Sequence, residues 1–205
     1  MITIKNESDT TEAESYEGVR ILLLTGSEMD PNAAGAALKL KRITEGKVAV
    51  AILDPSGESL KDADATYYLD DPDFADSDCR ATGRIASVLI KRIFPCDYVV
   101  CGTSSREGTS SSLAARIAKA HDMVPVFNVS AIDRSDDGSL RIIRNNEEES
   151  VTWKAVFSVS EGDWPEAAVE SREGRHLNRI DIGLGVYSMG IKGSKVRIVE
   201  VGGDV

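Results

Sequence analysis

The fold of this chain is most restricted by short apolar runs that alternate with helix-like segments. Val19–Leu24 ends in Thr-Gly-Ser, and Lys47–Leu53 ends in Asp-Pro-Ser-Gly, so both resemble strands buried on both faces. Asp97–Cys101 and Val124–Ile132 are two further strands of this kind. Such strands alternating with helices predict parallel βαβ units with right-handed crossovers. The expected fold is therefore an α/β, three-layer αβα, Rossmann-like domain with an open and mainly parallel sheet.

The helices are indicated by their end signals. Asp30 can serve as an N-cap, Pro31 suits a first helical turn, and Gly46 suits a helix end. Pro95 ends a second helix, in which apolar residues recur at helical spacing. The helices are expected at 33–43, from 77 or 78 to about 92, and at 113–120, with a short strand at 65–69.

The pattern changes after Ile132. Ser135–Gly138 is a hairpin turn signal, and Leu140–Arg144 and Val151–Val159 have the character of β segments joined by residues 145–149. The simplest interpretation is an antiparallel hairpin appended to the parallel sheet. The expected domain organisation is a flexible acidic tail at 1–17, the α/β nucleotide-binding domain at 18–160, and an irregular extension at 161–205 that ends in the strand Lys195–Val201.

Composition excludes several classes of protein. A chain of 205 residues with 41% hydrophobic side chains can form a proper core and is not expected to be disordered. A net charge of −10 argues against binding to nucleic acid or to anionic membranes. No apolar stretch is long enough to span a bilayer and the first residues do not have the pattern of a secretory signal, so we expect a cytoplasmic location.

Metal chemistry is also not expected. The chain has only two histidines, and its three cysteines lack the spacing of a zinc site or a redox pair. The expected role of the cysteines is that of small buried hydrophobic residues.

The most informative candidate site is the loop that follows the strand Asp97–Cys101. Ligands of open parallel sheets bind beyond the carboxyl ends of the strands, and this loop also opens a helix. Backbone amides at that helix start, together with hydroxyl side chains, could hold a phosphate; alternatively, the serines only cap the helix. A Walker A loop needs Lys followed by Ser or Thr directly after its second glycine, but Thr109-Ser110 follow Gly108 here. The loop also lacks the Gly-x-Ser-x-Gly pattern of a nucleophile elbow, and no GxGxxG dinucleotide fingerprint follows the first strand.

Four ordered segments resemble one known family. Asp30–Ala33 resembles its Asn-Pro segment, Val48–Pro55 its second strand and turn, Asp73–Arg84 its acidic stretch before a helix, and Asp97–Ser112 its strand and loop. The family is the electron transfer flavoprotein beta subunit and, more loosely, the related N-terminal domain of the alpha subunit. The resemblance covers about residues 19–160.

This resemblance implies a function. Members bind AMP or a second FAD in the beta subunit, pair with an alpha subunit that carries the redox FAD, and pass electrons from acyl-CoA or other dehydrogenases to an acceptor. The chain would then be an electron carrier without catalytic residues of its own. Carried over by position, the nucleotide contacts would be Leu24, Thr25, Asp30, Pro31, Asn32, Ala33, Leu53, Gly102, Thr103, Ser104, Ser105, Glu107, Gly108, Thr109, Ser110, Ser111, Ser112 and Leu113.

The sequence departs from the family at two places. Ser111-Ser112 stands where Gly-Gln is usual, and the segment beginning at Glu161 lacks the motifs of the arm that docks the alpha subunit. Two alternatives therefore stay open. One is a stand-alone, self-associating nucleotide-sensing module that resembles universal stress proteins and has no redox activity. The other is a small phosphoryl- or adenylyl-transfer enzyme, which has the least support because no Lys, His or paired carboxylates accompany the loop.

Overall fold

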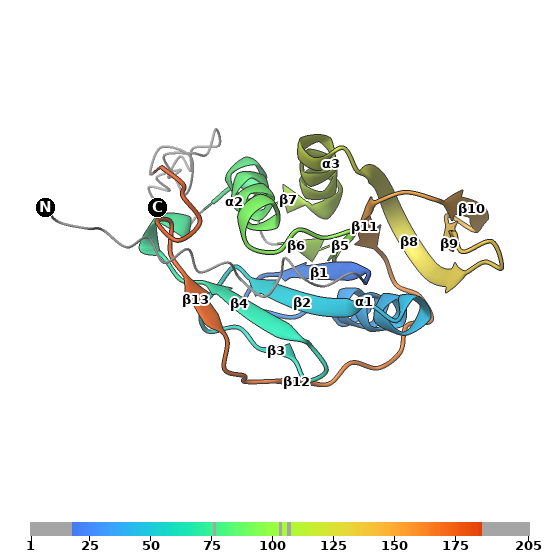
Figure 1. Ribbon diagram of the computed structural model, residues 1–205, viewed down its shortest axis with the longest axis horizontal. Coiled ribbons are helices and arrows are strands. Elements are labelled where there is room, and N and C mark those ends of the chain that lie inside the picture. Colours follow the sequence, from blue (N-terminus) through green and yellow to red (C-terminus); the bar gives the residue numbers. More distant parts are fainter. Residues whose placement is uncertain (1–17, 76, 103, 106–107, 186–205) are drawn as a thin grey trace, which may run out of the picture.

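The computed structural model describes residues 18–75, 77–102, 104–105 and 108–185 (Figure 1). Its centre is a nine-stranded sheet in the order β10-β9-β8-β11-β5-β1-β2-β4-β13. The strands are β1 (Arg20–Thr25), β2 (Lys47–Ile52), β4 (Ala65–Leu69), β5 (Tyr98–Cys101), β8 (Val124–Arg134), β9 (Leu140–Arg144), β10 (Glu147–Val151), β11 (Ala155–Val159) and β13 (Arg175–Leu177). Only the β8–β9 and β9–β10 pairs of this sheet are antiparallel, which confirms the predicted mainly parallel α/β fold.

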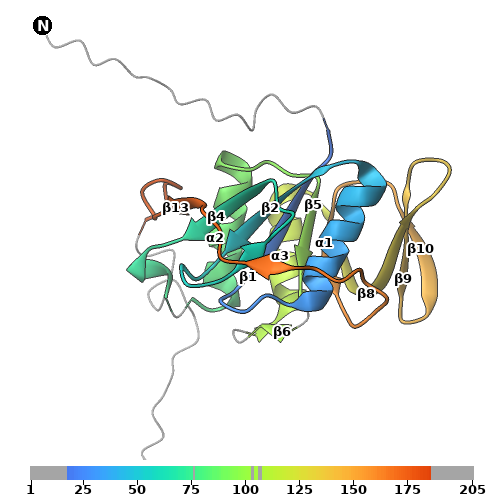
Figure 2. The same ribbon diagram turned by 90° about the horizontal axis from the view of Figure 1, so that it is seen from below.

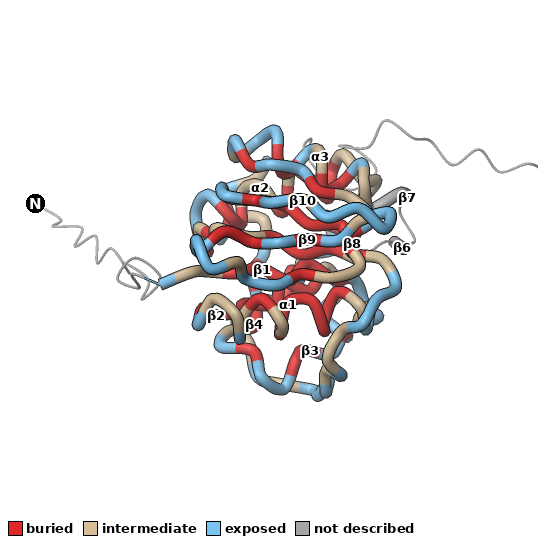
Figure 3. Tube along the Cα trace, turned by 90° about the vertical axis from the view of Figure 1, so that its right-hand side faces the viewer, coloured by how far each residue is buried: buried red, intermediate tan, exposed pale blue. Residues whose placement is uncertain are grey.

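Helices cover both faces of the sheet. The helix α1 (Pro31–Thr44) packs on one face, and α2 (Cys79–Arg92) and α3 (Ser110–His121) pack on the other. Ile21 and Leu23 belong to the core under α1, whereas Leu22 and Leu24 belong to the core under α2 and α3. This burial on both faces explains why the β1 sequence is apolar without alternation. Figure 3 shows the buried residues concentrated in the strands and on the inner sides of the helices.

The helix ends follow the predicted signals closely. Asp30 caps α1, with its Oδ1 accepting hydrogen bonds from the backbone N–H groups of Asn32 at 2.9 Å and Ala33 at 3.3 Å. Asp78, rather than Ser77, caps α2. The end of α1 differs slightly from expectation because Glu45, not Gly46, adopts the left-handed backbone, with φ of 54°.

The region after Ile132 differs from the predicted single hairpin. Asn145 and Asn146 both have positive φ, 51° and 64°, and form the tight turn between β9 and β10. Most of the predicted connection at 145–149 is instead the strand β10, and the expected strand at 151–159 shortens to β11, which is fully buried and lies parallel between β8 and β5. Residues 152–154 connect β10 to β11 without strand structure, and Trp153 in this connection is 61% exposed.

A C-terminal arm, residues 160–177, crosses the outside of the domain. It leaves β11, passes over α1, and ends as β13 on the edge of β4, while β12 (Val169–Glu170) pairs with β3 (Ser59–Leu60) (Figure 1). The arm thus adds two short strands to a segment that the sequence pattern predicts to be irregular. Both strands are too short for a recognisable alternation, so their formation depends on tertiary contacts. The predicted tail at 1–17 and the predicted strand Lys195–Val201 lie outside the described residues, and the predicted domain boundaries stay predictions.

Within the part of the chain that the structure describes, no helix has both the length and the apolar character needed to cross a membrane.

Candidate functional site

The carboxyl ends of three neighbouring parallel strands form the candidate site. In register, Thr25 at the end of β1 lies beside Ile52 of β2, and Leu24 lies beside Cys101 of β5. The backbone N–H of Leu53 donates to the Thr25 carbonyl at 2.9 Å. The structure therefore brings Leu24, Thr25, Leu53 and Gly102 to one edge of the sheet, where α/β proteins of this kind bind ligands.

The turn between β1 and α1 is fixed by its own hydrogen bonds. Thr25 is buried, and its hydroxyl donates to the Glu28 carbonyl at 3.0 Å. Asp30 uses its Oδ1 to cap α1, as described above. A ligand at this turn would therefore meet the backbone and the second carboxylate oxygen of Asp30. Of the next predicted residues, Pro31 is exposed, Asn32 is half-buried and Ala33 is buried.

The second oxygen of Asp30 lies against the end of β5. A Cβ atom at Gly102 would stand only 2.1 Å from the Asp30 Oδ2, which is far inside van der Waals contact. Only glycine therefore fits at position 102. This approach brings the start of α1 and the loop after β5 together, and Figure 2 shows the start of α1 and β6 on the same side of the molecule.

The loop after β5 folds as a small hairpin. The strand β6 (Ser104–Ser105) pairs antiparallel with β7 (Gly108–Thr109), and α3 begins directly afterwards at Ser110. The helix thus starts three residues before the predicted Leu113, and Ser110, Ser111 and Ser112 belong to its first turn. Ser111 is half-buried, Ser112 is exposed and Leu113 is buried, while Thr103 and Glu107 lie outside the described residues.

The two helix starts at this edge differ in charge. Asp30 already occupies the positive end of α1, whereas the first turn of α3 contains no acidic residue. The backbone amides at the start of a helix point outward at its positive end, where they can bind an anion. The start of α3 can therefore accept a phosphate, and the start of α1 cannot do so without repulsion from the Asp30 carboxylate.

A second turn, Asp54–Gly57, completes the same edge. Ser56 donates to the Asp54 carboxylate through its backbone N–H at 2.8 Å and its hydroxyl at 2.6 Å, and these bonds lower the pKa of Asp54. A Cβ at Gly57 would lie 3.2 Å from the carbonyls of both Gly26 and Ser27, so the two turns pack tightly. Gly57 is not among the predicted site residues, although the sequence Asp-Pro-Ser-Gly is a turn signal.

The chemistry of the edge is that of a binding site. It offers amides, hydroxyls and isolated carboxylates, and no described group of three or more His, Cys, Asp or Glu residues could hold a metal ion.

The chain also matches a known family. A family model described as electron transfer flavoprotein domain matches residues 26–176. The match begins at the β1–α1 turn, includes the hairpin loop and α3, and extends past residue 160 through most of the C-terminal arm. A search of curated proteins found no match to this chain.

Proposed function

Because this chain belongs to the electron transfer flavoprotein domain family, we propose that it is a beta-like subunit. In this role it binds an adenine nucleotide, AMP or FAD, and supports electron transfer with an alpha-like partner. We also propose that it works in the cytoplasm, as an electron carrier with no nucleophile or acid–base pair of its own. An acyl-CoA dehydrogenase or another dehydrogenase would supply its electrons.

The observation that supports this proposal best is the meeting of the predicted contacts at one edge. Thr25, Leu53 and Gly102 lie on adjacent strand ends, and Asp30 is in close contact with Gly102. The residues present suit a nucleotide because Gly102 leaves no side chain between the loop and α1. We propose that the phosphate binds at the start of α3 and the nucleoside lies against the ends of β1 and β2.

The residues of the chain have distinct parts in this proposal. The first-turn amides and hydroxyls of Ser111 and Ser112 hold the phosphate, and Asp30 directs it away from α1 by charge repulsion. When FAD is bound, its isoalloxazine ring supplies the redox chemistry, whereas AMP would have a structural role. The protein orients the nucleotide at the strand ends.

One observation favours a second candidate, a stand-alone adenine-nucleotide-binding module without redox activity. In the family that the sequence resembles, the arm after the hairpin docks the alpha subunit. Here the arm packs on its own domain: Tyr68 donates to the Arg172 carbonyl at 2.8 Å, and His176 Nδ1 lies 3.0 Å from the Asp70 carboxylate. An arm that is used internally is not free to bind a partner.

The test begins with the native protein. We expect mass spectrometry of the molecules released on denaturation to detect AMP or FAD, and an absorbance scan to show whether flavin is present. Gly102→Ala should lose the nucleotide, whereas Gly185→Ala is the matched control because a Cβ there meets nothing within 4 Å. If the native protein releases no adenine nucleotide, both candidate functions are overturned.

Partner capture separates the two candidates. A copurifying flavoprotein of alpha type supports the beta-like subunit. A stable homodimer that holds a nucleotide but captures no flavoprotein supports the stand-alone module.

A further inference from the structure

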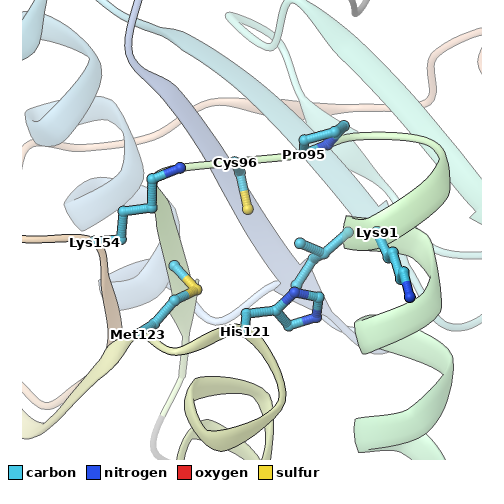
Figure 4. Close-up of a pocket in the computed structure, with 7 residues that line it drawn as sticks. Lys91, Pro95, Cys96, His121, Met123 and Lys154 are labelled. Carbon is cyan, nitrogen blue, oxygen red and sulfur yellow. The ribbon is translucent and has the colours of Figure 1, made fainter.

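A cavity of about 170 Å³ lies at the edge of the sheet opposite the candidate nucleotide site. It lies where the carboxyl ends of α2 and α3 meet the connections that lead into β5, β8 and β11. Figure 4 shows side chains from α2, from α3 and from these three connections around one space. Its lining residues are Ile90, Lys91, Pro95, Cys96, His121, Met123 and Lys154.

The inner wall of this cavity is apolar and rich in sulfur. Cys96 and Met123 are buried, and Figure 4 shows their sulfur atoms turned toward the same space. Burial raises the pKa of the Cys96 thiol to about 12, so this group is neutral at physiological pH. Ile90 is also buried. Such a wall favours an aliphatic group over a strongly hydrated one.

The mouth of the cavity is basic. Lys91, in the last turn of α2, and Lys154, between β10 and β11, are both exposed. The Lys154 Nζ lies 3.1 Å from the Asp97 Oδ1. Lys91 forms no ion pair with any residue that the structure describes. The cavity lining therefore carries two ammonium groups, of which one is paired with a carboxylate, and the exposed Asp122 follows His121 in the chain.

His121 adds a polar group to the cavity wall. Its Nε2 is buried and makes no hydrogen bond of normal geometry with any residue that the structure describes. Burial lowers the pKa of His121, Lys91 lowers it further, and the Ser87 carbonyl partly opposes both effects. A negative charge bound beside the ring would favour the imidazolium form and give it a counter-ion.

We propose that this cavity binds a short aliphatic carboxylate of about six non-hydrogen atoms, with its tail on Ile90 and Met123 and its carboxylate at Lys91 and His121. The size follows from the volume, because an engineered apolar cavity of about 150 Å³ holds benzene.

A soft metal cation is the competing occupant, since thiol, thioether and imidazole are its ligands. The neutral Cys96 thiol would first have to lose its proton, and the Lys91 and Lys154 ammonium groups repel a cation. The charges therefore favour the carboxylate. This inference does not depend on the proposed nucleotide function, because the two sites share no residue and lie at opposite edges of the sheet.

Histidine NMR on the full chain tests the proposal directly. The chain contains only two histidines, so His176 provides an internal reference for His121. We expect sodium butyrate to shift the His121 ring signals in a saturable way and to raise the pKa of His121, with His176 unchanged. Butan-1-ol has the tail without the charge and sodium chloride has the charge without the tail, so neither should reproduce both effects.

Two exposed lysines give a matched pair of variants. Lys91→Gln should weaken butyrate binding about two- to five-fold, the value of a solvent-exposed ion pair. Lys119→Gln removes a charge from the same region, but Lys119 does not line the cavity, so affinity should not change. The proposal is overturned if chloride shifts His121 as butyrate does, if butan-1-ol competes equally well, or if a soft cation such as Ag⁺ saturates the site and butyrate does not.

Discussion

At the residue scale, Gly102 is the position in the candidate site with the least room for a side chain. Alanine at this position would place its Cβ 2.1 Å from the Asp30 carboxylate, so either β5 or α1 must move. We expect Gly102→Ala to lower the free energy of unfolding by about 1–3 kcal/mol, as overpacked cores do. Urea denaturation measures this loss. Gly26→Ala is the control, because a Cβ there meets nothing within 4 Å, and an equal loss in both variants would contradict the steric argument.

Asp30 can be tested separately for its capping role and its charge. Asp30→Ala removes the acceptor for the Asn32 and Ala33 amides, so the free energy of unfolding should fall by about 1 kcal/mol. Asp30→Asn should retain most of the stability because asparagine is an equally good N-cap. If the carboxylate directs phosphate away from α1, Asp30→Asn should also change AMP affinity, measured by calorimetry. An unchanged affinity would remove Asp30 from the proposed phosphate placement.

The three thiols should differ strongly in reactivity. Burial raises the pKa of both Cys96 and Cys101 to about 12, whereas Cys79 is only half-buried. Because the thiolate is the reactive form, a thiol reagent at pH 8 should label one thiol per folded chain quickly and the other two only on unfolding. Cys79→Ser should abolish the fast reaction. A fast phase that persists in this variant would contradict the burial of Cys96 and Cys101.

At the element scale, the C-terminal arm depends on one glycine of α1. A Cβ at Gly35 would lie 2.6 Å from the Pro165 carbonyl oxygen and 2.7 Å from the Trp164 Cβ. Trp164 is also held by its indole N–H, which donates to the Ser160 carbonyl at 2.9 Å. Gly35→Ala would improve helix propensity by about 1 kcal/mol, but it forces the arm away from α1.

We expect the arm of Gly35→Ala to be cleaved faster by trypsin at Arg172 and Arg175 than the arm of the native protein. Gly83→Ala in α2 is the matched control, since it gains the same helix propensity and its nearest neighbour atom is at 3.3 Å. Faster cleavage in both variants would show that the effect is not specific to the arm.

The elements that sequence could predict are those whose pattern is local. β1, β2 and β5 are continuous apolar runs, and α1 and α2 carry their caps in the sequence. The placement of β11 in the sheet does not follow from its local sequence, because this apolar run fits a hairpin strand or a parallel strand equally well. The Asn145-Asn146 turn and the packing of β11 between β5 and β8 decide between the two. The three-residue strand β13 exists because the edge of β4 is available for pairing.

At the scale of the whole molecule, the candidate site could be predicted in outline for a topological reason. Parallel neighbouring strands point their carboxyl ends to one edge, so Thr25, Leu53 and Gly102 must meet once the strand order is β5-β1-β2. The contact between Asp30 and Gly102 could not be predicted in the same way, since it depends on how α1 sits on the sheet. The hairpin in the loop and the packing of Gly57 also arise from tertiary contacts.

The stability of the whole molecule should depend on pH through His121. Burial is the main cause that lowers the pKa of His121 from its ordinary value of 6.5, with a contribution from Lys91. Between the lowered pKa and 6.5 the unfolded chain binds more protons than the folded one, so stability falls as the pH decreases through this window. The Asp54 and Asp137 carboxylates, whose pKa values are lowered by hydrogen bonds from Ser56 and Ser139, act only at lower pH, below their ordinary value of 3.8.

Urea denaturation at pH 7.5, 6.5 and 5.5 separates these contributions. We expect the native protein to lose stability from pH 7.5 to 5.5, and His121→Gln to lose less, because glutamine has no proton to gain. His176→Gln should retain the native pH dependence if His121 is its source. The charged groups in the region of His121 are Lys91, Lys154, Asp97 and Asp122. An unchanged slope in His121→Gln would therefore assign the pH dependence to another group and remove the evidence that the His121 ring is held neutral by burial.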